Sequence, residues 1–153
     1  KALPAGPDWR AYRSPFHTLD LKVPRGWTVA REDRQGLELR PGVYADAGWI
    51  RLDPRPAGKG REAAPARIAS VHRPGWEQHG FEVLRSVPFT LGGPSKAPGL
   101  VLDLRSRGIA TARFRIAWID GPAPCWAAEW LERDALHEPP VLEELVASLR
   151  RTS

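Results

Sequence analysis

A run of alternating apolar and polar residues from Gly99 to Glu132 constrains the fold more than any other part of the sequence. Three segments carry an apolar side chain at every second position: Leu100, Leu102 and Leu104, then Ala112, Phe114, Ile116 and Trp118, and last Trp126, Ala128 and Trp130. A period of two is typical of β-strands. Gly108 and the segment Asp120-Gly121-Pro122 lie between the three, and these residue types favour turns. The run predicts a three-stranded antiparallel meander with one apolar face.

Shorter alternating segments on the N-terminal side of this meander predict additional strands. They are Thr18–Pro24, Thr28–Arg31, Leu37–Arg40, Trp49–Asp53 and Phe81–Leu91, with a short edge strand at Arg10–Ser14. Together with the two helices described next, they indicate an α+β fold. We expect an antiparallel sheet of about six or seven strands with helices packed on it.

Two segments have the spacing of helices. The first begins near Glu62 and Pro65, and we expect it to end near Arg73 because Pro74-Gly75 interrupts helical structure. A further turn around Trp76 is the alternative. The second follows Pro139 and Pro140 and has an apolar stripe, which consists of Val141, Leu142, Leu145, Val146 and Leu149. We expect this closing helix to lie across the apolar face of the meander.

The chain length and charge limit the domain organisation and the partners. With 153 residues the chain fits one domain. We expect it to span residues 10–153, with residues 1–9 as the end of a Pro/Gly linker to a tether upstream. The net charge of +5 comes from scattered arginines rather than a basic cluster, so we expect no specific nucleic-acid binding. If the two meander turns centre near Ile109 and Pro122, Arg115 lies between Asp103 and Glu129 in a cross-strand ladder.

The chain carries no motif of a recognised catalytic or metal centre. His72 and His79 are seven residues apart, without the close spacing of a shared metal site, and we expect the histidines to be solvated. Cys125 is the single cysteine, which excludes an internal disulfide and a cysteine-based zinc site, and we expect it to be buried and unreactive. Neither a nucleophile elbow nor a phosphate-binding loop is present. We therefore predict no catalytic residue, no cofactor and no metal.

Seven tryptophans are the most unusual part of the composition. We expect Trp118, Trp126 and Trp130 to belong to the core. The three candidates for ligand contact lie outside the meander's core face, and they are Trp9, Trp49 and Trp76. One interpretation is an aromatic platform for a sugar, and the one we favour is core packing with partial exposure.

The order of these segments resembles the PsbP-like superfamily, which includes the PsbP subunit of photosystem II and the Ran-binding Mog protein. The resemblance rests on the segments Leu21–Trp27, Gly80–Leu84, Leu91–Pro94 and Val146–Arg150, in that order around the meander. Within the superfamily the chain is most similar to single-domain bacterial members, such as actinobacterial lipoproteins and the extracytoplasmic domains of receptor Ser/Thr kinases. The resemblance implies an α/β/α sandwich without enzymatic activity.

This resemblance sets the functional expectation. We predict a non-catalytic extracytoplasmic domain that senses or binds a protein or a small molecule, tethered to a membrane only through a segment upstream of Lys1. The alternative within the same fold is a cytoplasmic chaperone for secretion effectors. An enzyme acting on a carbohydrate or a lipid is a third class.

Overall fold

A computed structural model describes residues 9–41, 48–54, 64–93, 96–108, 110–120, 123–132 and 141–151. In chain order the elements are β1 (Arg10–Arg13), β2 (Leu19–Val23), β3 (Trp27–Asp33), β4 (Gly36–Pro41), β5 (Gly48–Pro54), α1 (Pro65–Gln78), β6 (Phe81–Thr90), β7 (Pro98–Ser106), β8 (Thr111–Ile119), β9 (Cys125–Glu132), α2 (Val141–Ala147) and β10 (Arg150–Arg151). The order of elements confirms the α+β class. Residues 1–8, residues 55–63 and the proline pair before α2 lie outside the described residues.

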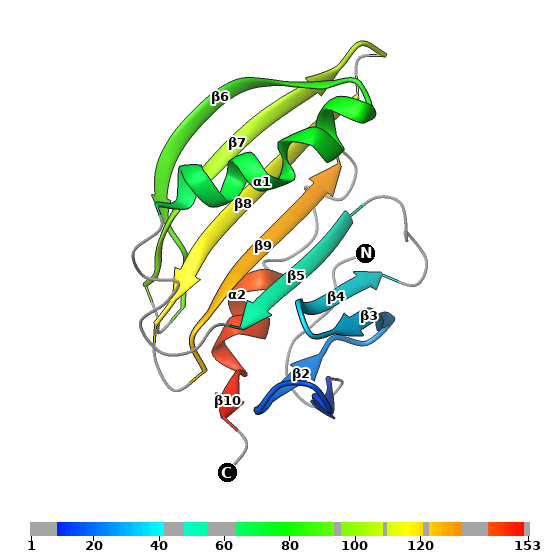
Figure 1. Cartoon of the computed structure of the whole chain (residues 1–153), viewed down its shortest axis with the longest axis vertical. Helices are drawn as coiled ribbons and strands as arrows, with labels where there is room; N and C mark the ends of the chain where they lie inside the picture. The colour runs from blue at the N-terminus through cyan, green and yellow to red at the C-terminus, as the bar shows by residue number, and fades with distance from the viewer. Residues whose placement is uncertain are drawn as a thin grey trace.

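A seven-stranded sheet forms the centre of the molecule, with the strand order β3-β4-β5-β9-β8-β7-β6. Every pairing in it is antiparallel. The predicted meander is present as β7, β8 and β9, and β5 pairs with the far side of β9 (Figure 1). A smaller three-stranded sheet, in the order β1-β2-β10, packs beside it, and its central strand β2 pairs with both the first and the last of the described strands.

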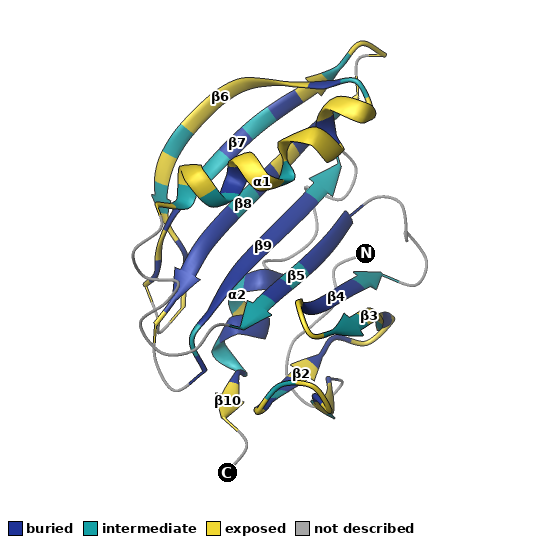
Figure 2. Cartoon of the chain, in the orientation of Figure 1, coloured by how far each residue is buried: buried dark blue, intermediate teal, exposed yellow. Residues whose placement is uncertain are grey.

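The central strands are apolar on both faces, so the sheet separates two cores. The α1-side core contains the predicted wall of the meander, with Phe114 completely buried and Trp118, Trp126 and Trp130 around it. The α2-side core contains the intervening positions of β8 and β9, which are Ala117, Ile119, Cys125 and Ala127. Figure 2 shows the resulting buried band along β8, β9 and β5, whereas the edge strand β6 is mostly exposed.

The closing helix covers the face opposite to the one we predicted. Leu142 and Leu145 pack in the α2-side core with Ala127 and with Leu21 of the small sheet. The tryptophan wall is covered by α1, which lies in front of the meander in Figure 1, while α2 lies behind the sheet. The physical reason is that Ala117, Ile119, Cys125 and Ala127 make the second face apolar as well, and α2 buries it.

Helix α1 continues past the point where we predicted its end. It runs from Pro65 to Gln78 with Pro74 inside it, and His79 follows as its C-terminal cap. Trp76, in the turn after Pro74, is buried in the α1-side core. Burial of this large side chain outweighs the backbone hydrogen bond that Pro74 cannot make, so tertiary packing overrides the local breaker. Within the described residues, no helix is long and apolar enough to cross a membrane.

The register of the first meander turn differs from the predicted one by two residues. Asp103 pairs with Arg113 rather than with Arg115, because the loop closes where Ser106 N–H donates to the Ala110 carbonyl at 2.8 Å. The second turn has the predicted register, and Arg115 lies opposite Glu129. The three-residue ladder is therefore present only in its Arg115–Glu129 half.

Candidate ligand-binding cavity

A cavity of about 560 Å³ lies between α1 and the end of the central sheet. Helix α1 contributes His72, Gly75 and Trp76, followed by His79 at its cap. The sheet side is formed by Arg40, Trp49, Arg51, Phe81, Ser106, Ala110, Trp130 and Glu132. This volume falls within the roughly 300–1,000 Å³ that small-molecule sites usually occupy. The cavity is the larger of two described here.

Aromatic rings form the apolar part of the wall and pack against one another. Trp49 lies directly opposite Trp130 across the β5–β9 pairing, so it extends the tryptophan wall of the meander. Trp76 packs on Phe114 at 4.9 Å between ring centroids and stacks on Trp130 at 6.3 Å. Phe81 meets Trp130 edge to face at 5.0 Å. These contacts occupy the ring faces and fix the shape of the wall.

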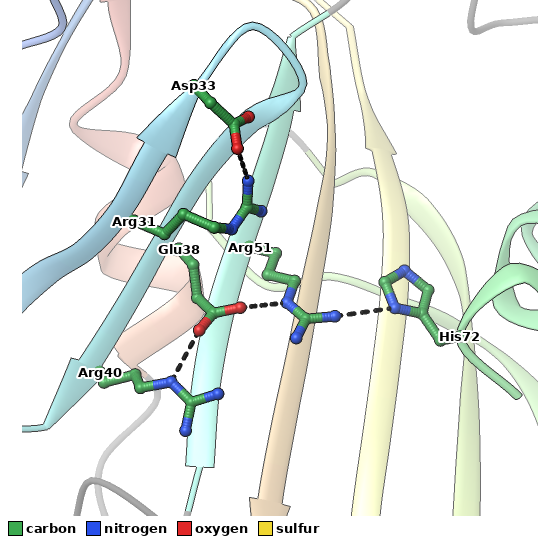
Figure 3. Close-up of polar contacts among 6 residues, drawn as sticks. All are labelled: Arg31, Asp33, Glu38, Arg40, Arg51 and His72. Atoms are coloured by element: carbon green, nitrogen blue, oxygen red, sulfur yellow. Dashed lines mark hydrogen bonds and ion pairs between the residues drawn. The ribbon is translucent and has the colours of Figure 1, made fainter. Parts of the chain in front are cut away.

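Arg51 is the central charged group of the wall. Its Nε donates to Glu38 at 2.5 Å, and Arg40 Nε donates to the other oxygen of the same carboxylate at 2.7 Å. The Arg51 guanidinium carbon lies 3.9 Å from the centroid of Trp49, which is a cation–π contact. Figure 3 shows Glu38 between the two arginines. Burial opposes ionisation of Glu38, but hydrogen bonds from Arg40 and Arg51 outweigh it and hold its pKa below the usual value.

His72 joins this cluster from the helix. Its ring stacks on Trp49 and lies 5.1 Å from Phe114, and Arg51 Nη1 donates toward its Nδ1 at 3.4 Å (Figure 3). Burial, with the charge of Arg51 as the second cause, lowers the pKa of His72 to about 4. The imidazole is therefore neutral at physiological pH, with Nδ1 as the acceptor. Our prediction of a solvated His72 is wrong, because α1 packs on the sheet and holds the imidazole against Trp49 and Phe114.

The three candidate tryptophans are separated by the fold. Trp49 and Trp76 both line the cavity, while Trp9 packs in the α2-side core away from it. Their exposed fractions are 9%, 6% and 7%, so all three are buried, and the premise that Trp49 and Trp76 lie outside the meander's core face is wrong. Their contact with a ligand stays a prediction. The indole N–H groups of Trp76 and Trp118 have no hydrogen-bond partner among the described residues.

The charged cluster was missed by sequence reasoning, although part of its signal is local. Glu38 and Arg40 alternate in one strand, and Trp49 and Arg51 alternate in the next, so each pair shares a face. What brings the two pairs together is the β4–β5 register, in which Glu38 lies opposite Arg51. The sequence between β4 and β5 gives no signal for that register.

The meander arginines are engaged in ion pairs on the opposite face. Arg115 makes a two-point contact with Glu143 of α2 at 2.8 Å and donates to Glu129 at 2.6 Å. Asp103 pairs with Arg113 at 3.0 Å and Arg85 at 3.3 Å. This arrangement fits a structural role for these arginines. The absence of specific nucleic-acid binding stays a prediction.

Cys125 and the polar cluster around Glu32 lack the geometry of a reactive site. Cys125 is completely buried, and burial together with the charge of Asp53 raises its pKa to about 12. Near β1, Glu32 accepts hydrogen bonds from Tyr12 and Ser14, but the His17 ring donates to the Asp33 carbonyl rather than to this cluster. Within the described ranges, no three His, Cys, Asp or Glu side chains are grouped to hold a metal ion. A second cavity of about 270 Å³ lies beside Phe16 and Arg151.

Comparison with known proteins supports the fold. The sequence matches no protein-family model and no curated protein. Among solved structures, the chain is similar to the solution structure of cyanobacterial PsbP (CyanoP) from Synechocystis sp. PCC 6803. The two share 10% sequence identity, the match covers 97% of each chain, and the TM-score is 0.51. At this identity the likeness shows a PsbP-like fold and nothing finer.

Proposed function

We propose that this protein is a non-catalytic binding domain whose ligand enters the cavity between α1 and the central sheet. The observation that carries the proposal is the aromatic wall of Trp49, Trp76, Phe81 and Trp130 with the Arg51 guanidinium fixed beside it. Small-molecule sites are typically mostly apolar and contain a few oriented polar groups. The Glu38–Arg51–His72 contacts hold such a polar group in place before any ligand arrives.

A binding role accounts for this cluster better than a catalytic one. Arg51 bears a permanent charge, His72 is neutral, and Glu38 is bonded to two guanidinium groups. The set thus consists of groups that orient and neutralise a ligand. The PsbP-like fold is compatible with this role.

The proposal is tested by filling the cavity. A Cβ atom at Gly75 meets nothing within 4 Å, and Gly75 lies on the cavity wall, so Gly75→Leu is the substitution chosen to place added side-chain bulk at the cavity. Ser70→Leu adds the same side chain at an exposed α1 position that is not among the lining residues. A mixed panel of neutral, cationic and anionic aromatic compounds is measured on the full chain by heteronuclear NMR and thermal shift.

We expect compounds that bind to move the indole resonances of Trp49 and Trp76, to bind Gly75→Leu at least about tenfold more weakly, and to bind Ser70→Leu normally. If no compound in the panel binds at millimolar concentration, or if Gly75→Leu binds as well as wild type, the cavity is not the binding site and the proposal is wrong. Melting of each variant checks that it is folded.

We also propose that the domain acts outside the cytoplasm and is tethered through a segment upstream of Lys1. What supports this is the resemblance to the single-domain bacterial members of the superfamily. Fractionation of cells that express the protein with its natural upstream sequence tests it, and recovery in the cytoplasm would favour the chaperone alternative. Among the described residues, the exposed large apolar side chains are those of Phe16, Val71, Val83 and Leu84. They lie on three separate segments and do not favour the chaperone alternative.

A further inference from the structure

The residues of the cavity wall indicate the chemical class of the ligand. This inference rests on the proposed function. Arg51 lines the cavity and has one carboxylate partner within the described residues, Glu38, which contacts its Nε edge. The Nη1 group is directed at the neutral His72, and Nη2 has no partner in that part of the chain. The edge of the Arg51 guanidinium that Nη1 and Nη2 form is therefore without an anionic partner among the described residues.

The guanidinium is also held in a fixed orientation. The Trp49 ring supports its plane at 3.9 Å, Glu38 binds Nε at 2.5 Å, and His72 lies 3.4 Å from Nη1. An arginine held in this way loses little side-chain freedom when it binds a carboxylate through two parallel hydrogen bonds. Lysine would offer the same charge without the fork.

The other residues of the wall determine whether the uncharged part of the ligand is polar or apolar. Trp76 and Trp130 stack on each other, Phe81 abuts Trp130, and none of the three is more than 9% exposed, so little open ring face is left. A sugar that needs an open aromatic face gains little from such a wall, whereas an apolar body can contact the ring edges. The volume of about 560 Å³ accommodates a small molecule rather than a folded partner.

We infer that the cavity binds an organic carboxylate with an aromatic or other apolar body, and that the free Nη edge of Arg51 receives the carboxylate. Glu132, also on the wall, repels a second negative charge on the ligand, and Arg40, the other arginine of the wall, already donates to Glu38. The ligand class is therefore a monocarboxylate rather than a di- or tricarboxylate.

The test uses matched probes on the full chain. Indole-3-acetate and its neutral amide, indole-3-acetamide, have nearly the same shape and differ in the charge that Arg51 would bind. Binding is measured by calorimetry, and the ring resonances of His72 report whether the probe occupies this cavity. The variants are Arg51→Gln and Arg51→Lys, with Arg85→Gln as the control, because Arg85 is exposed and pairs with Asp103 outside the cavity.

We expect the carboxylate to bind about tenfold to a hundredfold more tightly than the amide, since a charged hydrogen-bonded pair is lost with the amide. Arg51→Gln should remove that difference, Arg51→Lys should retain part of it, and Arg85→Gln should retain all of it. Thermal melting shows whether Arg51→Gln is folded, and the comparison of the two probes on the wild-type protein does not depend on any variant.

Each contrary result has a distinct meaning. If acid and amide bind equally well, or if folded Arg51→Gln keeps the preference, the inference is wrong while the proposed function stands. If neutral members of the wider panel bind and indole-3-acetate does not, the inference is again wrong on its own. If neither the panel nor the two probes bind, the inference and the proposed function fail together.

Discussion

The side chain of His72 is packed between Trp49 and Phe114 while a guanidinium lies 3.4 Å from its Nδ1. Burial and this positive charge both disfavour the imidazolium, so the folded protein keeps His72 neutral well below the pH at which a free histidine is protonated. At the scale of single residues, the cavity wall thus places the permanent cation of Arg51 beside a neutral acceptor that positions it. The neutral imidazole is what allows Arg51 and His72 to be neighbours.

This arrangement predicts a loss of stability in mild acid. The pKa of His72 is lowered from 6.5 to about 4 in the folded protein, so the unfolded chain takes up a proton first as the pH falls. The contribution of neutral His72 to the free energy of unfolding is fully present above about pH 6.5 and is lost as the pH falls toward 4. Because one pKa unit corresponds to about 1.4 kcal/mol, the decline from this residue reaches up to about 3 kcal/mol.

Urea unfolding at a series of pH values measures the effect. In His72→Gln the decline between pH 6.5 and 4 should be smaller by that amount. His79→Gln, at the exposed cap residue directly after α1, is the matched control variant. An unchanged profile in His72→Gln would mean that His72 is protonated as readily in the folded state as in the unfolded one.

At the scale of elements, one ion-pair cluster ties two strands to the closing helix. Arg115 of β8 contacts Glu129 of β9 and Glu143 of α2, and Glu129 is only 2% exposed. Burial lowers the pKa of Arg115, but hydrogen bonds and charges from the two carboxylates outweigh it, so its pKa stays above the ordinary value. Burial raises the pKa of Glu129 despite its contact with Arg115. The cluster therefore depends on Arg115 remaining in place.

Replacing Arg115 by Ala should cost about 3–5 kcal/mol of unfolding free energy, because it leaves a buried carboxylate without its partner. Arg113→Ala is the matched control. Arg113 is two residues away on the same face, about half exposed, and paired with Asp103, so its loss should cost less than about 1 kcal/mol. Chemical denaturation compares the two. Equal losses would show that the buried position of Arg115 contributes nothing.

Helix α1 gives a second prediction at this scale. Pro74 lies inside the helix, where proline removes a backbone hydrogen bond and costs up to about 3 kcal/mol. Pro74→Ala should restore that bond and raise the thermal midpoint, although alanine also frees the unfolded chain and offsets about 1 kcal/mol of the gain. Pro65→Ala, at the first helical position, removes a proline without restoring an internal bond and should not be stabilising. A lower midpoint for Pro74→Ala would indicate that proline shapes the packing of Trp76.

At the scale of the whole molecule, the central sheet serves two cores at once. One face carries α1 and the tryptophan wall, and the other carries α2 and the small sheet. The shared strands β5, β9 and β8 connect the two cores, so we expect both to unfold in one transition, as in most single domains of this size. The cavity lies toward one end of the α1 side, where its wall is supported by strands that are buried on both faces.

A substitution at Phe114 tests whether the two cores unfold together, because this residue is completely buried and contacts Trp49, His72 and Trp76. Phe114→Ala should lower the unfolding free energy by about 3–5 kcal/mol through lost apolar transfer and a new void. Phe16→Ala, at a residue that is 58% exposed, should change it by less than about 0.5 kcal/mol. Near-UV and far-UV circular dichroism should report the same midpoint for Phe114→Ala. Separate midpoints would mean that the two cores unfold independently.

The sequence by itself determined which segments form strands and which side chains are buried in the meander. Leu102, Phe114 and Trp130 are buried as their period of two predicts, because alternation is imposed by the geometry of a single strand. The sequence also contains the signal for the second apolar face of the sheet. The runs Ile116–Ile119 and Cys125–Ala128 are apolar without interruption, which indicates strands buried on both faces.

Only the tertiary structure decided which helix covers which face, how β5 aligns with β9, and where the cavity lies. Trp49 meets Trp130 through the pairing of β5 with β9, which are far apart in the chain. Arg51 meets Glu38 through the register of β4 and β5, and it meets His72 through the packing of α1 on the sheet. Local periodicity assigns a side chain to a face of its own strand, but the partner strand and its register depend on the packing free energy of the whole domain. The same free energy carries α1 past Pro74 and brings His72 and Trp76 to the cavity wall.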